Sequence, residues 1–495
     1  MNLKLCGKNT IIYGLGTICL RASAFLLIPL YTHALSVEDY GLFSTLLLTI
    51  QIMIILMSVG MRTSLLRFAK EFEDGKVMGA LMGSSLAINA VVGVIIIGIT
   101  LIFLQPFFRT ILHIDQVSEY LALAGAVALV QTLCQHLMSY YQAKNEALRF
   151  SLVGISAAIL LLISNAVFLV IFHQGLRGAL IASIVTYCVV FMFVWVDVLI
   201  KKTGFTLSMA MMPKLIRFGF PLVFSMLGQV LVGSASIYFL SYSEGLEVVA
   251  IFSLGYKLAM VAGMVLTLPF QLAYQPLVFE NIESLDLKAK MARIFTYFYV
   301  AMAIISVAIL LASRILLPYI APPEYASAYL VIILMLPTVA SSGLVIFGET
   351  LLSIVKKTHI VGTAAGLGGI ASLGFNYMLV PAMGWYGAVI ASNISCLLTG
   401  LIIFGLGLKA FTMRLEWFRT AFAVGVFAAF LLIAFVLHPA SNVIFYGGLA
   451  AATVMIASLV KIWNFCDDNE IASMRSLLQG IKVRFKPCAV IQNGK

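Results

Sequence analysis

Apolar segments long enough to cross a bilayer as helices follow one another along almost the whole chain, and they constrain the fold more than any other feature. A membrane-spanning helix needs about 20 mostly apolar residues. About fourteen such spans are predicted, at residues 10–33, 40–61, 77–104, 118–141, 150–172, 178–200, 218–240, 247–270, 294–317, 327–354, 360–381, 386–408, 420–438 and 441–463. They leave no room for a large soluble domain.

The composition points the same way. Of the 495 residues, 62% are hydrophobic and only 10% are charged, which is too little charge for a soluble protein of this length. The net charge of +11 comes from cations spread over short loops, so no nucleic-acid partner is predicted. The seven cysteines show no CxxC spacing and no histidine partner at metal spacing. We therefore predict no disulfide framework, metal site or cofactor.

The basic residues of the loops predict the orientation. Alternate connections contain most of the 31 Lys and Arg residues, whereas those on the other side contain only Arg109, Arg177 and Arg314. By the positive-inside rule both termini are predicted to be cytoplasmic, which requires an even number of spans. The N-terminal segment could also be a signal peptide, but its apolar run is too long and Arg21 interrupts it. We expect it to remain as the first helix.

An internal repeat divides the predicted helices into two halves. The dipeptide Phe-Ser at 43–44 recurs at 252–253, and the motif Gly-Ala-x-Ile-Ala-Ser at 178–183 recurs at 387–392, both at an offset of 209. Two matches at one offset suggest duplication of a six-span unit, with chance similarity between apolar segments as the alternative. Because six is even, the halves would share one orientation and be related by a pseudo-two-fold axis along the membrane normal, with a site between them.

The predicted class is an all-α polytopic membrane protein in five parts. Six-helix bundles occupy residues 1–200 and 218–408, and an amphipathic cytoplasmic linker joins them at 201–217. Two additional helices follow at 409–463. A cytoplasmic tail at 464–495 has apolar residues at helical spacing.

Motifs of membrane enzymes and ATP-driven pumps are missing from the sequence. It contains no HExxH, no Walker A and no Gly-x-Ser-x-Gly pattern, and its longest loops carry no paired carboxylates. Transport is favoured over enzymology. Its energy would come from an ion gradient, an electrical potential or the gradient of the substrate itself.

Two cations lie near the middle of predicted spans, Arg21 in the first and Lys257 in the eighth. A cation at that depth costs roughly 2.5–3.5 kcal/mol on insertion scales, and buried membrane charges usually serve a function. With no acidic residue at the same depth, the pair suggests an anionic substrate between the halves. A phosphate or pyrophosphate would suit both, Arg by forked donation and Lys as a point charge. The alternative is that each snorkels or pairs with a polar group for packing.

Three further cations are weaker candidates for binding the substrate. Arg62 and Arg67 lie at the inner end of the second span, where they either fix the topology or gather an anionic headgroup at the entrance. Arg314 lies near the outer surface and either contacts the substrate or meets Glu324.

Two acidic residues are candidates for ion coupling. Glu349 precedes Lys356 and Lys357 by about two helical turns, so it either forms a boundary pair or couples protons. Asp197 lies four residues before Lys201, the spacing of a helical ion pair, which is the alternative to a coupling role.

Uncharged polar residues inside the spans would either line a cavity or bridge helices. The sequence does not sort them into these two groups. They are Gln51, Asn89, Gln131, Gln135, His136, Asn165, Gln229, Gln271, Asn376 and Asn393.

Three motifs carry a resemblance to a known family. They are Leu-Ser-Val-Glu-Asp-Tyr-Gly-Leu-Phe-Ser at 35–44, the two Gly-Ala-x-Ile-Ala-Ser motifs, and Phe-Gly-Phe-Pro-Leu at 218–222. With these motifs and the predicted spans, the chain resembles the Wzx-type polysaccharide flippases of the multidrug/oligosaccharidyl-lipid/polysaccharide exporter superfamily. The resemblance extends over essentially the whole chain and does not identify the sugar.

The resemblance implies a V-shaped pair of six-helix bundles in the bacterial inner membrane, alternately open to each side. Such proteins move undecaprenyl-pyrophosphate-linked oligosaccharides, for example O-antigen units, to the periplasmic leaflet. Arg21 and Lys257 would then be the cavity cations that meet the pyrophosphate. The implied partners are this lipid-linked substrate, membrane lipids, and the polysaccharide polymerase with its chain-length machinery.

Two other functions are alternatives. One is an ion-coupled antiporter of the same superfamily that exports a soluble small molecule. Antiporters for cations tend to have an acidic residue near the first helix, where this chain has Arg21. The other is a membrane scaffold for a polysaccharide assembly complex.

Overall fold

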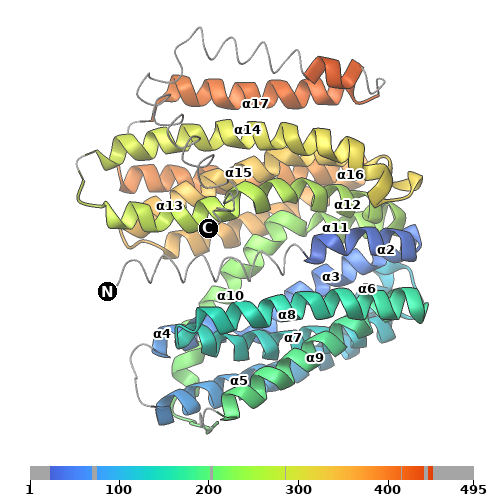
Figure 1. Cartoon of the computed structure of the whole chain (residues 1–495), viewed down its shortest axis with the longest axis vertical. Helices are drawn as coiled ribbons and strands as arrows, with labels where there is room; N and C mark the ends of the chain where they lie inside the picture. Colours follow the sequence, from blue (N-terminus) through green and yellow to red (C-terminus); the bar gives the residue numbers. More distant parts are fainter. Residues whose placement is uncertain are drawn as a thin grey trace, which may run out of the picture. The chain divides into compact units, whose positions relative to one another are not determined.

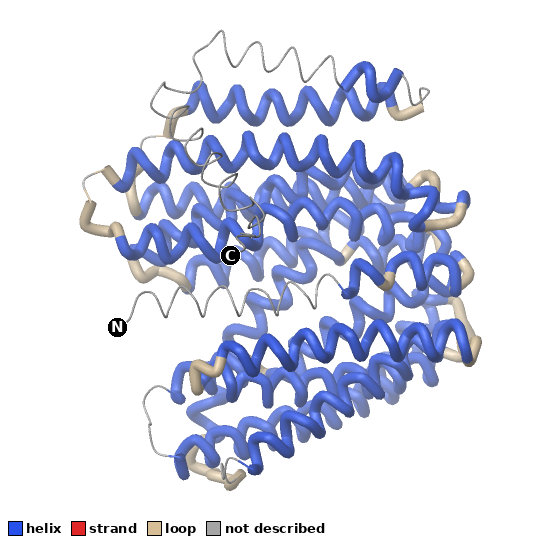
Figure 2. Tube along the Cα trace, in the orientation of Figure 1, coloured by secondary structure: helices blue, strands red, loops and turns tan. Residues whose placement is uncertain are grey.

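The computed structural model describes residues 23–69, 75–200, 205–284, 286–413, 415–439 and 444–449. These residues form helices joined by short turns, and no strand occurs among them (Figure 2). Eleven of the described helices are long and apolar enough to span a membrane, and a shorter apolar helix lies at Ser23–Ala34. The predicted class, an all-α multi-pass membrane protein, is confirmed.

The first group of helices, here named the N-lobe, contains α2 to α9. Within it α3 packs against α5 and α7, and α7 packs against α9. Its core includes the buried side chains of Met82, Leu137 and Tyr141. The elements are α2 (Ile28–Ala34), α3 (Val37–Ser58), α4 (Met61–Ala69), α5 (Gly75–Ile99), η1 (Thr100–Leu104), α6 (Gln105–Leu112), α7 (Val117–Ala143), α8 (Ala147–Ala166), η2 (Val167–Ile171) and α9 (Gly175–Ile200).

The second group, here named the C-lobe, contains α10 to α16. Here α16 packs against α10 and α15, and α12 packs against α15. α10 begins at Met212, so helical structure starts inside the predicted linker of 201–217. The elements are α10 (Met212–Ser234), α11 (Ser236–Ser243), α12 (Leu246–Ala262), η3 (Gly263–Thr267), α13 (Leu268–Glu280), α14 (Leu287–Ile320), η4 (Pro323–Tyr325), α15 (Ala328–Ile354) and α16 (His359–Ala410).

α16 contains two of the predicted spans, 360–381 and 386–408. Its helical path is broken at Gly384, where φ is 58° and ψ is −137°, a conformation that strains any residue with a Cβ. The two arms then lie side by side, because a Cβ added to Gly368 of the first arm would meet the hydroxyl of Thr399 of the second. One of the eleven helices therefore accounts for two spans.

The number of fourteen spans and the cytoplasmic location of the termini stay predictions. Residues 1–22, which hold most of the first predicted span, lie outside the described part. Residues 450–495 also lie outside it, together with most of the fourteenth span and the tail. Arg21 belongs to the first of these segments, so the structure does not describe that candidate.

The start of α3 lies in one of the motifs that carry the family resemblance. The hydroxyl of Ser36 caps the helix by accepting a hydrogen bond from the N–H of Asp39 at 3.0 Å. Glu38 and Asp39 put carboxylates in the first turn, where the helix dipole favours them. Val59, with φ at 45°, ends α3 before the short helix α4. This capped helix carries the residues of the N-lobe that meet Lys257.

The connection between the lobes lies against the N-lobe. In the segment 205–211, the N–H of Ser208 donates to the hydroxyl of Ser84 on α5 at 2.9 Å. The ring of Phe205 stacks on Trp195 of α9 with centroids 4.6 Å apart and an interplanar angle of 10°. This segment is therefore attached to one lobe before it reaches the other.

The chain divides into two compact units, Met1–Leu415 and Glu416–Lys495. Both lobes belong to the first unit. In the second, α17 (Trp417–Leu437) coincides with the predicted span at 420–438. In its first turn Arg419 Nη1 donates to Glu416 Oε2 at 3.3 Å.

Candidate functional site

At one end, here named the closed end, the two lobes contact each other, and the turns before α3, α7 and α12 lie there. The elements α6 and α11 contact each other there (right side of Figure 1). The hydroxyl of Ser241 on α11 donates to the backbone carbonyl of Ile111 on α6 at 3.2 Å. Closer to the middle of the helices, the hydroxyls of Thr49 and Tyr238 lie 2.8 Å apart across the lobes. The opposite end, which carries the segment 205–211, is named the linker end.

A cavity of about 710 Å³ lies between the lobes, a volume typical of small-molecule sites. Its N-lobe wall comes from α2, α3, α7, α8 and α9, and its C-lobe wall from α10, α12, η3, α13, α15 and α16. The walls are largely apolar with a few polar side chains. The main polar ones are Gln131, Ser183, Tyr187, Lys257, Gln271 and Thr338.

Lys257 is the one charged side chain among the described residues that line this cavity. It lies on α12, and its ammonium donates to the hydroxyl of Tyr40 at 3.2 Å and of Ser44 at 3.4 Å. Both acceptors lie on α3 of the other lobe. The ammonium also lies 4.8 Å from the centre of the Tyr40 ring, within range of a cation–π interaction. Because an ammonium has three donors, one is left for a ligand in the cavity.

Aromatic rings and amides form part of the remaining wall. Tyr31 donates to Asn165 Oδ1 at 2.9 Å, and its ring packs on Phe43 with centroids 4.7 Å apart, which fixes its orientation. Of the polar residues predicted to line a cavity or bridge helices, Gln131 and Gln271 line this one. A cation, aromatic faces and amides together can bind an anion that carries rings and hydroxyl groups.

A second cavity of about 300 Å³ lies within the C-lobe. Glu349 of α15 and Gln229 of α10 line it. Among the described residues no ion pair joins Glu349 to Lys356 or Lys357. The two cavities are adjacent, because they share five lining residues, Thr267, Gln271, Thr338, Ser342 and Cys396.

Three predicted cations lie away from the central cavity. Arg62 of α4 donates from Nη2 to Gln142 Oε1 at 3.0 Å, near the linker end of the N-lobe. Arg67 lies in the last turn of the same short helix. The guanidinium of Arg314 on α14 lies 5.7 Å from the centre of the Tyr329 ring. None of the three lines the cavity that contains Lys257.

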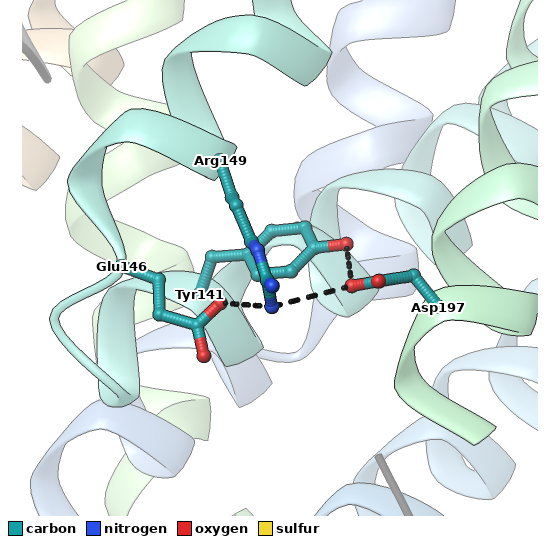
Figure 3. Close-up of polar contacts among 4 residues, drawn as sticks. All are labelled: Tyr141, Glu146, Arg149 and Asp197. Carbon is teal, nitrogen blue, oxygen red and sulfur yellow. Dashed lines mark hydrogen bonds and ion pairs between the residues drawn. The ribbon is translucent and has the colours of Figure 1, made fainter. Parts of the chain in front are cut away.

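Asp197 belongs to a polar cluster at the linker end of the N-lobe (Figure 3). Its Oδ2 accepts a hydrogen bond from the hydroxyl of Tyr141 at 2.8 Å and lies 4.0 Å from Nη1 of Arg149. Arg149 also donates to Glu146 at 2.9 Å. The predicted partner, Lys201, lies outside the described residues. Asp197 therefore bridges α7, α8 and α9, and it lines neither of the two cavities described above.

Tyr40 and Ser44 are the site residues that sequence reasoning missed. Both lie in the motif at 35–44, and Ser44 belongs to the Phe-Ser repeat. Those patterns marked the positions without indicating a role. Only the packing of α3 against α12 brings their hydroxyls to the ammonium.

No group of three or more His, Cys, Asp or Glu side chains that could hold a metal ion occurs among the residues that were searched, which are the described ones. The chemistry of the site is that of a binding cavity with one cation and several neutral donors and acceptors.

Sequence comparison identifies one family. Residues 6–282, more than half of the chain, match the model of the family described as polysaccharide biosynthesis protein. A search among curated proteins found no match.

Several solved structures have the same fold. An inward-facing multidrug resistance MATE family transporter of the MOP superfamily is 15% identical, with a TM-score of 0.63, over 81% of this chain and 94% of that one. A mutant MATE transporter from Vibrio cholerae is 16% identical, with a TM-score of 0.60, over 83% and 97%. A MOP superfamily transporter from Pyrococcus furiosus, described as having a binding pocket of reverse polarity that suggests a different function, is 15% identical, with a TM-score of 0.58, over 82% and 95%. These likenesses show the MATE-like fold of the MOP superfamily.

Proposed function

Because the chain belongs to the polysaccharide biosynthesis protein family and has the fold of MOP superfamily transporters, we propose that it flips undecaprenyl-pyrophosphate-linked oligosaccharide units across the bacterial cytoplasmic membrane. It acts by alternating access, with the headgroup bound between the lobes. The structural neighbours are named as transporters, which supports transport as the activity of this chain.

The observation that carries the proposal is Lys257 in the wall of the inter-lobe cavity. A cation in a largely apolar cavity is costly unless an anion or good acceptors compensate it. Tyr40 and Ser44 are neutral acceptors, and no acidic side chain lies among the described lining residues. A pyrophosphate would supply charged oxygens, whose hydrogen bonds to an ammonium are roughly twice as strong as neutral ones.

The polarity of the pocket supports an anionic cargo. The Pyrococcus furiosus transporter of the same fold is described by the reverse polarity of its pocket, and a different function was suggested for it on that ground. In the present chain the described lining carries one positive and no negative side chain. The repelling effect of that charge disfavours cationic drugs as cargo.

The remaining wall supports a saccharide next to the anion. Tyr31, Tyr187 and Tyr256 line the cavity with aromatic side chains, and Gln131 and Gln271 line it with amides that both donate and accept hydrogen bonds. The lipid tail would stay in the bilayer. A polysaccharide polymerase and chain-length machinery would consume the flipped unit on the far side.

The proposal is tested by substituting Lys257 in cells that depend on this protein for surface polysaccharide. Lys257→Ala is expected to lower surface polysaccharide at least about tenfold at unchanged protein level, since a hydrogen bond to a charged group contributes about 1.5–3 kcal/mol. Lys257→Arg keeps the charge and is expected to retain more activity. Arg21→Ala, at the other predicted cation, is expected to act like Lys257→Ala.

Lys288→Ala is the matched control. Lys288 lies over the ring of Phe411, 5.0 Å from its centre, and does not line the cavity. Surface polysaccharide is measured by gel electrophoresis and lectin binding, and protein level by immunoblot. Normal polymer in Lys257→Ala would contradict the proposed headgroup site.

The second candidate is an ion-coupled antiporter for a soluble small molecule, and the position of the second cavity directly beside the first favours it. Glu349 lines that second cavity and has no ion-pair partner among the described residues. This function predicts protection of cells against toxic compounds, lost in Glu349→Gln. Glu247→Gln is the control, since Glu247 lies in the first turn of α12 and lines neither cavity. Full polysaccharide export by the native protein without protection against toxic compounds would reject the antiporter function.

A further inference from the structure

The side chain of Lys257 belongs both to the wall of the cavity and to the contact between the lobes. It lines the cavity in which a ligand would bind, and its ammonium also donates to Tyr40 and Ser44 of the opposite lobe. Tyr40 is fully buried and its ring packs edge-on against Tyr325 with centroids 5.8 Å apart, so its hydroxyl is fixed in place. A group that draws the ammonium into the cavity would therefore break contacts between the lobes.

The backbones of α3 and α12 come close together beside Tyr40, about three helical turns before Lys257 on α12. A Cβ added to Gly41 would lie 1.9 Å from the backbone oxygen of Leu246, so the two backbones nearly touch. α3 and α12 also carry the Phe-Ser pairs of the predicted repeat, at 43–44 and 252–253. At the repeat offset Lys257 corresponds to Leu48, so only one of the two helices supplies an ammonium at this level.

The helix that carries Lys257 also has a point where it can bend. α12 passes into the π-helical turn η3, Gly263–Thr267, and Pro269 follows. π-turns and proline both weaken the helical hydrogen-bond ladder and often mark functional bends. Lys257 therefore lies one to two turns before a point at which its helix can bend.

We propose that Tyr40 and Ser44 form a resting site for the Lys257 ammonium, and that an anionic headgroup releases the closed end by taking the ammonium from them. The identity of the anion rests on the proposed function, whereas the resting site itself does not. Tyr40 and Ser44 are positioning residues in this scheme. They hold the lobes together in the empty carrier and compete with the cargo for one cation.

The exchange is favourable because of the acceptors involved. In the empty protein the ammonium is held by two neutral hydroxyls at 3.2 and 3.4 Å, both near the long end of the hydrogen-bond range. A phosphate oxygen is a charged acceptor and forms a stronger bond. A ligand shifts a conformational equilibrium only by its differential affinity for the two states, and the competition for Lys257 supplies that difference.

The first test measures binding to the full-length protein in detergent, with geranyl pyrophosphate as the probe and geraniol as the uncharged comparison. Tyr40→Phe keeps the ring and its packing on Tyr325 but removes the acceptor. It is expected to bind the probe about threefold to tenfold more tightly than the native protein, because the ammonium is no longer engaged. Ser44→Ala is expected to change affinity in the same direction and provides a second variant if Tyr40→Phe folds poorly.

Tyr238→Phe is the matched control. It removes another hydrogen bond between the lobes, the 2.8 Å contact with Thr49, without contacting Lys257. It is expected to leave the affinity for geranyl pyrophosphate unchanged. A purely structural role for Tyr40 would weaken binding or leave it unchanged, so tighter binding identifies the competition.

The second test needs no ligand. In a chain whose seven cysteines are replaced by alanine, Ile111→Cys and Ser241→Cys report the closed end, since the two native residues are in contact. Cross-linking is expected to fall in Tyr40→Phe, Ser44→Ala and Lys257→Ala, and to fall in the native background when geranyl pyrophosphate is added. In Lys257→Ala, the addition of geranyl pyrophosphate should leave the cross-linking unchanged.

The outcomes separate the two proposals. Unchanged affinity together with unchanged cross-linking in both Tyr40→Phe and Ser44→Ala would overturn the resting site. Undiminished binding of geranyl pyrophosphate to Lys257→Ala would instead overturn the headgroup site of the proposed function, and reduced ligand-free cross-linking in that variant would still support the resting site.

Discussion

At the scale of single residues, charges near the linker end and the charge in the cavity have different surroundings. The carboxylate of Asp197 is satisfied by a tyrosine hydroxyl and faces an arginine, and the two charged side chains are 30% and 52% exposed. An exposed ion pair contributes little to stability, so the hydrogen bond from Tyr141 is the stronger contact. Lys257 has only neutral acceptors and a cavity beside it.

This difference gives a prediction for the Asp197 cluster. Tyr141→Phe is expected to lower stability by about 1 kcal/mol, because it leaves a partly buried carboxylate without its best donor. Asp197→Asn keeps an acceptor for Tyr141 and is expected to leave transport within about twofold of native. Thermal unfolding of the purified protein and surface polysaccharide are the two measurements. Loss of export in a stably folded Asp197→Asn would support the coupling role predicted from the sequence.

The sequence predicted Lys257 as a site residue but not its partners, and the reason is physical. A charge inside an apolar span is rare and costly, so it is conspicuous without any structure. A hydroxyl inside an apolar helix has a low free-energy cost because it can donate to the backbone carbonyl one turn back, as Thr45 and Thr49 do here. Tyr40 and Ser44 were therefore indistinguishable from ordinary packing residues until the crossing of α3 and α12 was known.

At the scale of helices, the crossing of α3 and α12 depends on the absence of a side chain at Gly41. An added methyl would overlap the Leu246 carbonyl, and relieving the overlap requires the two helices to separate. Since they belong to different lobes, the strain acts on the contact between lobes and not on the core of either one. Overpacking of this kind costs about 1–3 kcal/mol.

Gly41→Ala is therefore expected to loosen the closed end while each lobe stays folded. Disulfide cross-linking between cysteines at positions 111 and 241 should fall severalfold, and transport should fall with it. Gly98→Ala is the control, because nothing lies within 4 Å of a Cβ at Gly98. Equal cross-linking in the two variants would mean that the crossing tolerates a wider separation than the backbone contact indicates.

Helix positions were easier to predict than helix irregularities. Hydropathy located the spans because every backbone group in a bilayer must be satisfied within a helix. The 52-residue α16 was predicted as two spans, and the positive φ at Gly384 explains the reversal between them. The π-turns at Thr100–Leu104, Val167–Ile171 and Gly263–Thr267 had no sequence signal, since they insert one extra residue per turn without changing the apolar pattern.

At the scale of the whole molecule, the cavity should be reachable from one side only. The cross-lobe contacts at the closed end separate it from the compartment on that side, which the loop charges predict to be the periplasm. Cys396 lines both cavities and can report access from either side.

A membrane-impermeant maleimide is expected to label a variant retaining only Cys396 in inside-out vesicles and not in spheroplasts. The control is a variant retaining only Cys134, which is 1% exposed in the core of the N-lobe and should react from neither side. Labelling is measured by the gel shift of a polyethylene-glycol maleimide added after denaturation. Equal reaction of Cys396 from both faces would contradict a carrier sealed at the closed end.

Because the connecting segment is attached to the N-lobe, a rocking motion of the two lobes must pivot at a point beyond this attachment. Ser208 is bonded to Ser84, and further along the hydroxyl of Ser64 donates to the Leu215 carbonyl at 3.0 Å, so the first turn of α10 still travels with the N-lobe. The pivot must then lie in α10 beyond Leu215, close to one membrane face. From there α10 and α11 extend about 40 Å toward the other face, at 1.5 Å per residue. A rotation of about 10° at such a pivot would part the far ends by about 7 Å, so a small turn near the linker end is enough to open a passage at the closed end.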